Sequence, residues 1–374
     1  MERKESSKFI IKGPMDRESV PELRRKVLKL IRKDNISSLT VDLSEVSRLD
    51  TAGLALLVEW YRFLRRHGGR LKLAGLGEEV KKKIHLARLD KLLESYTCET
   101  DSGSEMDRSK RDVTEAAIEV QHLNSFYGDR QVLFDINMLI PRHKVTVIMG
   151  VSGCGKSTLL RHLIGLKSIE SGEVLIKGRS LRRFGEAQLR QYRRNCGVLF
   201  QSGALFNSMS VAENIAVPLK VHTRLADETI RVIAEIKLHQ VGLTGLGDYM
   251  PSQLSGGMKK RAGLARALAL DPEILFVDEP SSGLDPITAA GLDQLIAELR
   301  DTAGMTIVVV THELESAFRI ADQMIVMDQG RILVKGTPEA IRKSTDPRVQ
   351  QFLQREAEQD SADLDFYARV LLNA

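Results

Sequence analysis

The stretch GVSGCGKST, residues 150–158, constrains this chain more than any other part of the sequence. It follows VTVIM, an apolar run typical of a buried strand, and precedes TLLRHLIGL, which has a helical pattern. Glycines let the backbone point several N–H groups at one phosphate, and a helix N-terminus adds a favourable dipole. A glycine-rich turn that matched by chance would rarely have both neighbours. We therefore expect an α/β domain with a loop that holds the phosphates of a nucleotide.

The residue types within this loop have separate chemical roles. Lys156 can place a positive charge between the β- and γ-phosphates, and the Ser157 hydroxyl can bind Mg²⁺. Cys154 stands at a free position of the motif, where we expect a small filler. The residues expected to contact the nucleotide here are Gly150, Ser152, Gly153, Cys154, Gly155, Lys156, Ser157 and Thr158.

Two adjacent acids, Asp278 and Glu279, end the apolar run ILFV. A buried strand that ends in two carboxylates is costly unless a cation is near. Acids often end strands, but beside a phosphate-binding loop the pair predicts a magnesium site. We expect Asp278 to hold Mg²⁺ through water and Glu279 to be the general base that orients the attacking water.

Composition excludes several other classes of protein. The chain has 374 residues, a net charge of +5 and three cysteines. The length predicts two or three domains, and the small charge favours a solvated surface over nucleic-acid binding. An odd number of cysteines without a C-x-x-C pair fits a reducing cytosol better than a disulfide framework or a zinc site. No secretory signal and no run of roughly 18 apolar residues are evident, so other chains must supply any membrane spans.

The chain divides into four segments. Residues 1–96 alternate strand and helix patterns and predict a small α/β domain. Residues 97–114 are polar, and we expect a flexible linker that spans on the order of 25 Å. Residues 115–345 begin with partly antiparallel strands and continue as alternating strands and helices, interrupted by a helix-rich insert at about 205–250. The tail, 346–374, ends in DLDFYARVLLNA; its apolar groups favour docking on the first domain, own or neighbouring, over packing on the preceding domain.

A second candidate anion site lies in LSGGM, residues 254–258, where a helical pattern begins. Ser255, Gly256 and Gly257 leave free N–H groups at that helix N-terminus. Together with the phosphate loop and the acid pair, this motif resembles the ATPases of ABC transporters, whose elements stand in order across residues 115–343. The resemblance implies roles for four more residues: Tyr127 would stack on adenine (with a turn tyrosine as the alternative), Gln201 would sense Mg²⁺ and the membrane partner, His312 would contact the γ-phosphate, and Asp285 would end the SSGLD loop.

The resemblance also implies two chains at each nucleotide. In this family two ATPase domains face head to tail, so Ser255, Gly256 and Gly257 would reach the γ-phosphate held by Lys156 of a second copy. ATP, Mg²⁺ and a homodimer are therefore expected. Met258 stands where most members of the family have Gln, so one side-chain contact is expected to be lost while the backbone donors remain.

Further motifs narrow the resemblance. LSGGMKKRAGLARAL, LFNSMSVAENIAVPL and GTPEAIRKSTDPRVQQFL together resemble the ATPases of Mla-type phospholipid transporters, which work with a permease and an MCE-domain protein. VDLSEVSRLDTAGLALL resembles a STAS domain, the fold of anti-sigma-factor antagonists, and Mla systems contain a separate STAS subunit. Here the two are fused, which fixes their ratio and raises their effective concentration.

Thr51 matches the position that accepts phosphate in STAS signalling proteins. The simpler interpretation is that Thr51 is a helix N-cap, and losing such a cap would lower the stability of the domain by roughly 1 kcal/mol. A fused partner needs no reversible capture signal. We therefore expect the Thr51 end of its helix to contact the ATPase's helical insert, without any need for phosphorylation.

These observations predict an ATP-hydrolysing subunit that dimerises on ATP and drives a separate permease in lipid transport. We expect it at the cytoplasmic face of the inner membrane, with an MCE-domain protein as a further partner and no nucleic acid. Two alternatives stay open: the ATPase of a solute importer with a regulatory N-terminal domain, and a signalling module whose STAS domain binds a kinase-type partner. The proteins that co-purify with the chain distinguish them.

Overall fold

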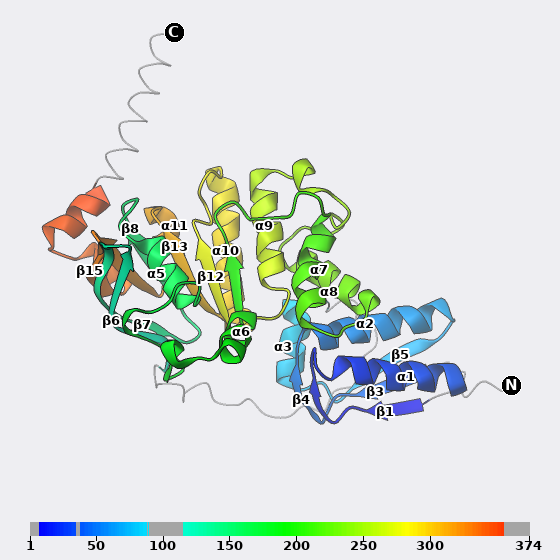
Figure 1. Ribbon diagram of the computed structural model, residues 1–374. Helices are drawn as coiled ribbons and strands as arrows, with labels where there is room; N and C mark the ends of the chain where they lie inside the picture. Colours follow the sequence, from blue (N-terminus) through cyan, green and yellow to red (C-terminus); the bar gives the residue numbers. More distant parts are fainter. Residues whose placement is uncertain (1–6, 35–37, 88, 90–114, 355–374) are drawn as a thin grey trace, which may run out of the picture. The chain divides into compact units, whose positions relative to one another are not determined.

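The computed structural model describes residues 7–34, 38–87, 89 and 115–354, and Figure 1 shows its elements. The chain forms two compact units. Unit 1 comprises residues 1–112 and 202–272, and unit 2 comprises residues 113–201 and 273–374. The helical insert of the second predicted domain therefore groups with the N-terminal domain. The predicted linker at 97–114 and residues 355–374 of the predicted tail lie outside the described residues.

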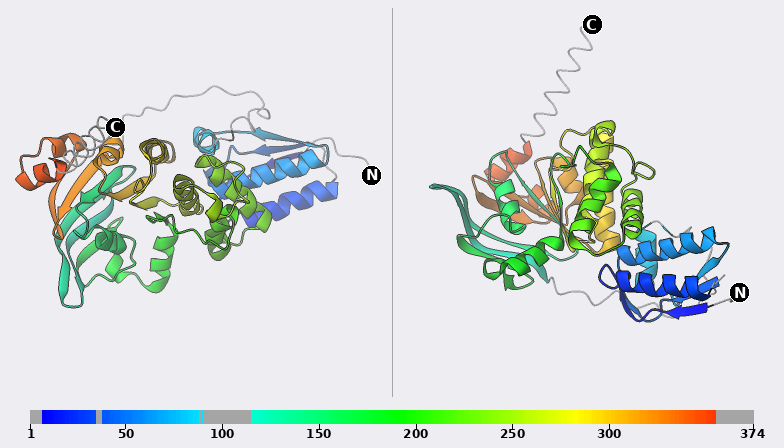
Figure 2. Two further views of the ribbon diagram at one scale, coloured as in Figure 1. Left: turned by 90° about the horizontal axis from the view of Figure 1, so that it is seen from above. Right: turned by 45° about the vertical axis from the view of Figure 1, so that its right-hand side comes forward.

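The N-terminal domain has the predicted α/β fold. Its main sheet is parallel, with strand order β1-β3-β5, and a second parallel pair joins β2 to β4. Helices α1 and α2 lie side by side in Figure 2, and the core between helices and sheet includes Leu39, Leu56 and the fully buried Trp60. The elements are β1 Ser7–Ile10, β2 Gly13–Met15, α1 Val20–Asp34, β3 Ser38–Asp42, β4 Val46–Leu49, α2 Thr51–Arg66, β5 Arg70–Ala74 and α3 Glu78–Leu86.

The start of α2 corrects one prediction. Asp50, not Thr51, is the N-cap residue, and its carboxylate accepts a hydrogen bond from the Gly53 N–H at 3.0 Å. Gly53 is required there because a Cβ atom would lie 2.3 Å from the Met15 carbonyl oxygen. Thr51 is thus the first residue inside the helix, and its hydroxyl is available for another partner.

The helical insert contains α7 Val211–His222, α8 Asp227–Gln240, the short 3₁₀ turn η2 Pro251–Gln253 and α9 Gly256–Ala267. It therefore extends further than the predicted 205–250. A capping box begins α7: the Ser210 hydroxyl accepts the Glu213 N–H at 3.2 Å, and the Glu213 carboxylate accepts the Ser210 N–H at 2.7 Å. Helix α7 packs against α8 and α9, and α8 also packs along α2 of the N-terminal domain within unit 1.

Unit 2 contains two sheets. The larger has the order β11-β12-β13-β8-β14-β15 and is parallel except for β15, while the smaller is antiparallel with the order β10-β9-β6-β7. The predicted mixture of parallel and antiparallel strands is confirmed. The strands are β6 Ala116–Tyr127, β7 Arg130–Pro141, β8 Val145–Gly150, β9 Ser171–Ile176, β10 Arg179–Ser180, β11 Cys196–Leu199, β12 Ile274–Asp278, β13 Thr306–Thr311, β14 Gln323–Asp328 and β15 Arg331–Gly336.

The helices of unit 2 bury one core against both sheets, and this core includes Leu159, Phe276 and Val308. Strand β8 is buried along its whole length, as its apolar sequence predicts. Its last residue begins the glycine-rich loop, so the parallel strands place this loop at their carboxyl ends. The helical elements are α5 Lys156–Leu163, η1 Leu181–Arg183, α6 Glu186–Arg194, α10 Pro286–Ala303, α11 Leu314–Ile320 and α12 Pro338–Arg342.

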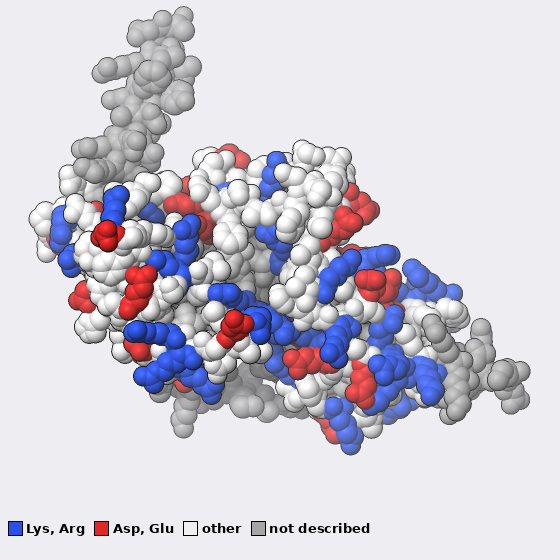
Figure 3. Space-filling view, viewed as in Figure 1, with Lys and Arg blue, Asp and Glu red and all other residues white. Residues whose placement is uncertain are grey.

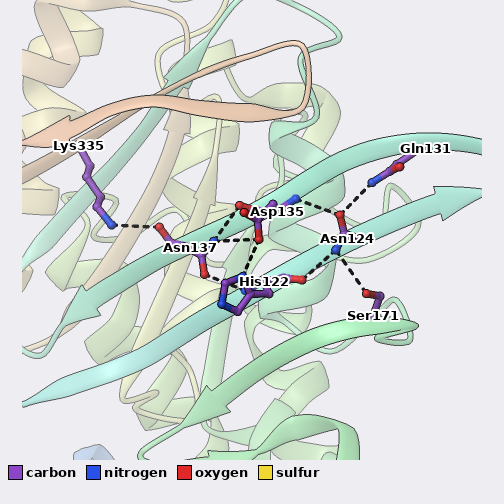
Figure 4. A network of polar contacts seen from close by, with 7 residues as sticks. All are labelled: His122, Asn124, Gln131, Asp135, Asn137, Ser171 and Lys335. Atoms are coloured by element: carbon purple, nitrogen blue, oxygen red, sulfur yellow. Dashed lines mark hydrogen bonds and ion pairs between the residues drawn. The ribbon is translucent and has the colours of Figure 1, made fainter.

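A polar network on the antiparallel sheet holds two irregular positions, as Figure 4 shows. His122 in β6 and Asp135 in β7 have φ angles of 48° and 50°, and their side chains meet at 2.7 Å. The pairing of β6 with β7 shifts register around His122. Amide oxygens of Asn137 and Asn124 accept the N–H groups of His122 and Asp135 at 2.9 and 3.0 Å. Side chains thus bind the backbone donors at these irregular positions, which gives the network a structural role.

Candidate active site

A cavity of about 580 Å³ in unit 2 gathers most of the residues predicted to bind a nucleotide. Its lining comes from the glycine-rich loop, the start of α5, the end of β12 and the segment after β13. The lining residues are Val132, Val151, Ser152, Gly153, Gly155, Lys156, Ser157, Thr158, Gln201, Asp278, Glu279, His312 and Phe352.

The glycines of the loop allow its tight path. Gly150 has a φ of 152°, and a Cβ atom there would lie 2.2 Å from the Met327 carbonyl oxygen. Gly155 has a φ of 104°, a conformation that side chains rarely adopt, and α5 begins at the next residue. Any larger residue at Gly150 or Gly155 would distort the loop, so the path of the loop requires glycine at both positions.

Lys156 is buried within this loop, with 7% of its surface exposed. Its ammonium group donates to the carbonyl oxygens of Gly150 and Val151, at 2.6 and 3.0 Å. Neutral carbonyls leave the positive charge of Lys156 uncompensated, so an anion in the cavity would find a desolvated cation at its wall. The Cys154 sulfur lies 4.0 Å from this ammonium group and is buried, and burial raises the pKa of the thiol. Cys154 does not line the cavity and packs in the hydrophobic core of unit 2, and its contact with a nucleotide stays a prediction.

Asp278 and Glu279 face the loop from the end of β12. Burial raises the pKa of Asp278, and the neighbouring Glu279 raises it further, while Lys156 opposes both effects. Two carboxylates in one cavity next to a single lysine fit a site for a divalent cation. Asp278, the Ser157 hydroxyl and the side chain of Gln201, all in the lining, are groups that could hold Mg²⁺.

Glu279 is held in an unusual backbone conformation. Its φ is 48°, and its N–H donates to the Val310 carbonyl oxygen at 2.8 Å. The His312 Nδ1 atom lies 2.8 Å from its carboxylate, so the two side chains predicted to act at the γ-phosphate are in contact. The structure thus brings together Lys156, Asp278, Glu279 and His312, which come from three separate parts of the sequence.

Tyr127 and Asp285, like Gly150 and Cys154, were predicted to contact the nucleotide but do not line this cavity. Tyr127 is 46% exposed, Lys167 lies 4.5 Å from the centre of its ring, and its hydroxyl accepts a hydrogen bond from Arg161 at 3.1 Å. Asp285 caps helix α10 by accepting the Thr288 N–H at 3.0 Å. Both residues have structural partners in this chain, and their contacts with a nucleotide stay predictions.

The second candidate anion site lies in unit 1, at the start of α9. Ser255 is the N-cap residue, and its hydroxyl accepts the Met258 N–H at 3.3 Å. Ser255 and Gly256 are exposed, whereas Gly257 is buried. The residues at the start of this helix therefore lie partly at the surface.

Phe352 is a lining residue that sequence analysis missed. It comes from the helical segment 347–354, within the predicted polar tail, and is half-buried. Val349, one turn earlier, is fully buried and fixes this segment. The spacing of Val349 and Phe352 indicates a helix with an apolar face. Because this segment is far from the glycine-rich loop in sequence, nothing indicated that Phe352 would line the cavity.

The predicted contact between the Thr51 end of α2 and the helical insert is present within unit 1. The Thr51 N–H and hydroxyl both donate to the Asp271 carboxylate, each at 2.7 Å. Lys237 of α8 donates to the same carboxylate at 2.6 Å and is almost completely buried. Arg17 adds a bond to the Leu270 carbonyl oxygen at 2.8 Å. The N-terminal domain therefore holds the turn that follows α9.

A second group of charges continues this contact along α2. Glu59 is buried, binds Arg24 of α1 at 2.6 Å and accepts the Thr229 hydroxyl of α8 at 2.9 Å. Arg62 pairs with Glu235 at 2.6 Å on the exposed side. A buried carboxylate needs such partners, because an unpaired charge would be costly there.

The two aspartates at the Thr51 contact have opposite pKa shifts. Burial, then the negative charge of Asp271, raises the pKa of Asp50 to about 6. Burial also raises the pKa of Asp271, but Lys237 and the two bonds from Thr51 outweigh that effect and lower it overall. Asp271 therefore carries the negative charge that binds Lys237.

Two family models match the chain. Residues 133–282 match the model described as ABC transporter, and residues 2–102 match the model of the STAS domain. The ATP-binding protein MlaF of the intermembrane phospholipid transport system of Haemophilus influenzae is 42% identical over 241 residues, which are 64% of this chain and 91% of that protein. A probable ribonucleotide transport ATP-binding protein, mkl, of Mycobacterium tuberculosis is 42% identical over 237 residues, 63% of this chain and 66% of that protein.

Solved structures resemble the ATPase region. A dimeric ATP-binding cassette in a post-hydrolysis state, bound to ADP and Pi, has a TM-score of 0.55 and 30% identity, covering 59% of this chain and 98% of that chain. The cbiO1 protein of Clostridium perfringens, part of the ABC transporter complex cbiONQ, has a TM-score of 0.57 and 31% identity, covering 64% and 99%. None of the helices that the structure describes is long and apolar enough to cross a membrane.

Proposed function

The chain belongs to the family of ABC transporter ATP-binding proteins and is an ATPase with a STAS domain at its N-terminus; we propose that it drives phospholipid transport through a separate permease. The observation that carries the enzymatic part of this proposal is the cavity in which Lys156, Asp278, Glu279 and His312 meet. The lipid cargo is supported by the relatives named for phospholipid transport and by the fused STAS domain.

Each side chain has a role that follows from its contacts. The amides of the glycine-rich loop and the buried Lys156 bind the phosphates and neutralise charge that develops on transfer. Bound Mg²⁺, held by Ser157, Asp278 and Gln201, would supply electrostatic stabilisation of the transferred group. Glu279 accepts the proton of the attacking water, and His312, in contact with that carboxylate at 2.8 Å, holds it in position and reaches the γ-phosphate. Thr158, Ser152 and Gly153 complete the phosphate contacts.

The second candidate anion site, at the start of α9, would provide the rest of the nucleotide site in another copy of the chain. We infer that Ser255, Gly256 and Gly257 of one copy complete the cavity of another, so that ATP joins a homodimer. The exposed N-terminus of α9 supports this assignment. Tyr127 would stack on adenine with the ring face that Lys167 leaves open, and Asp285 would lie at the contact between the copies.

The helical insert offers a surface for a permease. Phe206, Met209 and Tyr249 are large apolar side chains with 36% to 49% of their surface exposed, all before or within the insert. Exposed apolar groups close together in sequence and fold are typical of protein contacts. Docking there would place the ATPase at the cytoplasmic face of the inner membrane, with an MCE-domain protein as a further subunit of the assembly.

One variant tests the enzymatic assignment. Glu279→Gln keeps the shape of the side chain but cannot take the proton, so it should bind Mg-ATP, remain dimeric in size-exclusion chromatography and lose turnover. Wild-type hydrolysis by this variant would refute the role of Glu279.

Co-purification tests the cargo. The tagged full chain, extracted from membranes in mild detergent, should bring down a permease and an MCE-domain protein. A permease with a soluble solute-binding protein would favour a solute importer instead, and a soluble kinase without any permease would favour a signalling module.

A further inference from the structure

A second cavity lies in unit 1, between α1 of the STAS domain and the turn that joins α7 to α8. Its volume is about 750 Å³, which is in the range of small-molecule sites. Both domains supply its walls: Arg24, Arg25 and Lys29 come from α1, and Arg224 comes from the turn. The cavity therefore exists only while the STAS domain contacts the helical insert.

The lining of this cavity carries an excess of positive charge. Arginine or lysine accounts for four of its eight lining residues, and none is acidic. Arg24 is neutralised by Glu59 at 2.6 Å. Arg25, Lys29 and Arg224 form no ion pair with any residue that the structure describes. In Figure 3, Lys and Arg side chains gather over the α1 side of this unit.

None of the acids near these cations in sequence lines the cavity: Asp227, next to Ala226, is exposed and outside the lining, and two others are engaged with other cations. Glu22, on α1, pairs with Lys26 at 2.6 Å, and Lys26 does not line the cavity. Glu228, on α8, lies 3.9 Å from Arg231, which also lies outside the lining. Three cations thus share one concave surface whose lining contains no acid, although Glu22 offsets part of the charge of Arg25. An anion bound among them would relieve their mutual repulsion.

The remaining surface of the cavity is apolar. Val20 and Leu28 are buried and lie behind the cations. Ala226, also in the lining, is the N-cap of α8 and provides no side-chain hydrogen bond to the first amides of that helix. Guanidinium groups bind phosphate oxygens in pairs, and apolar walls strengthen such contacts by excluding water.

We propose that this cavity binds a phosphate-bearing anion, and that the bound anion strengthens the contact between the STAS domain and the helical insert. Arg25 and Lys29 hold the anion from the STAS side, and Arg224 holds it from the ATPase side. Because the ligand contacts both domains, its binding and their docking stabilise each other by the same factor. The anion is either a soluble phosphate or the headgroup of an anionic phospholipid.

Two binding measurements on the full chain test the site and separate the two sources. In the first, nucleotide-free protein is titrated with pyrophosphate in a calorimeter; since the glycine-rich loop also binds pyrophosphate, the readout is the number of sites per chain. In the second, the protein is sedimented with phosphatidylcholine vesicles that contain or lack phosphatidylglycerol. The variants are Arg224→Glu and Lys29→Glu, with Lys82→Glu as control, because Lys82 is an exposed lysine of α3 outside the cavity.

For a soluble ligand, wild type and Lys82→Glu should bind one more pyrophosphate than Arg224→Glu or Lys29→Glu, and Arg224→Lys should retain the extra site. For a lipid headgroup, the difference should appear only with phosphatidylglycerol vesicles, as at least a fivefold loss of bound protein. Thermal unfolding checks that each variant is folded. Equal binding by all variants in both measurements, or an equal loss in Lys82→Glu, would overturn the proposal, because general surface charge would then explain the result.

Discussion

The nucleotide cavity and the Thr51 contact are two polar sites of the same chain that are built in different ways. The cavity depends largely on the glycine-rich loop, nine residues at 150–158. The rest of its lining is Val132, Gln201, Asp278, Glu279, His312 and Phe352. The Thr51 contact depends on polar and charged side chains from distant parts of the sequence, since Thr51 and Asp271 lie 220 residues apart. The first arrangement leaves Lys156 with only neutral partners, whereas the second pairs Asp271 with a lysine and a threonine. At the nucleotide cavity, Lys156 forms no ion pair with any residue that the structure describes, so its charge can act on a ligand. At the docking contact, Lys237 and Asp271 form an ion pair.

At the nucleotide cavity, we expect Lys156→Ala to reduce ATP binding and hydrolysis strongly and thermal stability much less. Lys156→Ala removes the buried cation and leaves two carbonyl oxygens without their donor, so ATP binding should weaken and hydrolysis should fall roughly 10²–10³-fold. Since the variant also loses two hydrogen bonds and the attraction between Lys156 and Asp278, the free energy of unfolding without nucleotide should fall by roughly 1–3 kcal/mol at most. Hydrolysis assays and calorimetry measure the two quantities. A large loss of stability with normal ATP affinity would show that Lys156 is mainly structural.

The opposite behaviour is expected at the Thr51 contact. Thr51→Glu places a carboxylate beside Asp271 and Asp50, so the free energy of unfolding of the full chain should fall by roughly 3–5 kcal/mol, and ATPase activity should fall with it.

Thr51→Ser is the matched control, because it keeps the hydroxyl that binds Asp271 and should behave as wild type. Full activity of Thr51→Glu would mean that this contact does not affect the ATPase. Activity in Thr51→Glu alone would instead indicate a phosphorylation switch.

Phe352 tests whether a residue outside the glycine-rich loop contributes to nucleotide affinity, because it lines the cavity from the helical segment 347–354. Phe352→Ala removes one apolar wall, so KM for ATP should rise roughly two- to tenfold while kcat stays unchanged. Phe352→Leu keeps most of the apolar contact and should recover most of the affinity. A change in kcat without a change in KM would place Phe352 in the dimer contact rather than at the nucleotide.

Asp50 should make the free energy of unfolding depend on pH. Its pKa is raised from 3.8 to about 6, so between these values the folded chain retains a proton that the unfolded chain has lost. This group's contribution to stability is therefore greatest below about pH 4 and decreases as pH rises towards 6. Relative to Asp50→Asn, wild type should lose up to roughly 3 kcal/mol over this interval. An unchanged difference between the two proteins from pH 4 to 7 would contradict the assignment.

The sequence predicted sites formed by short contiguous motifs, but it did not predict contacts between residues far apart in the chain. The glycine-rich loop, the acid pair and His312 were predictable because each follows a recognisable strand, and parallel strands bring their carboxyl ends to one edge. The end of α2 was predicted as a contact surface, yet its cap was placed one residue late, since Asp50 and Thr51 are both good caps. Asp271 and Lys237 gave no signal, because an aspartate in a turn and a lysine on a helix are common. Tyr127 and Asp285 match family motifs, but their local partners could not be foreseen.

The spacing between Thr51 and Asp271 also has a consequence for biosynthesis. The two residues are 220 positions apart, and a ribosome adds on the order of 5–20 residues per second, so roughly 10–40 s pass between their synthesis. Until the insert is synthesised, the nascent STAS domain displays Glu59 without Thr229 and the start of α2 without Asp271, although Glu59 can already pair with Arg24. The domain has its own core around Leu56 and Trp60, which allows it to fold before the insert emerges. The N-terminal domain is thus a template already in place when the helices of the insert leave the exit tunnel.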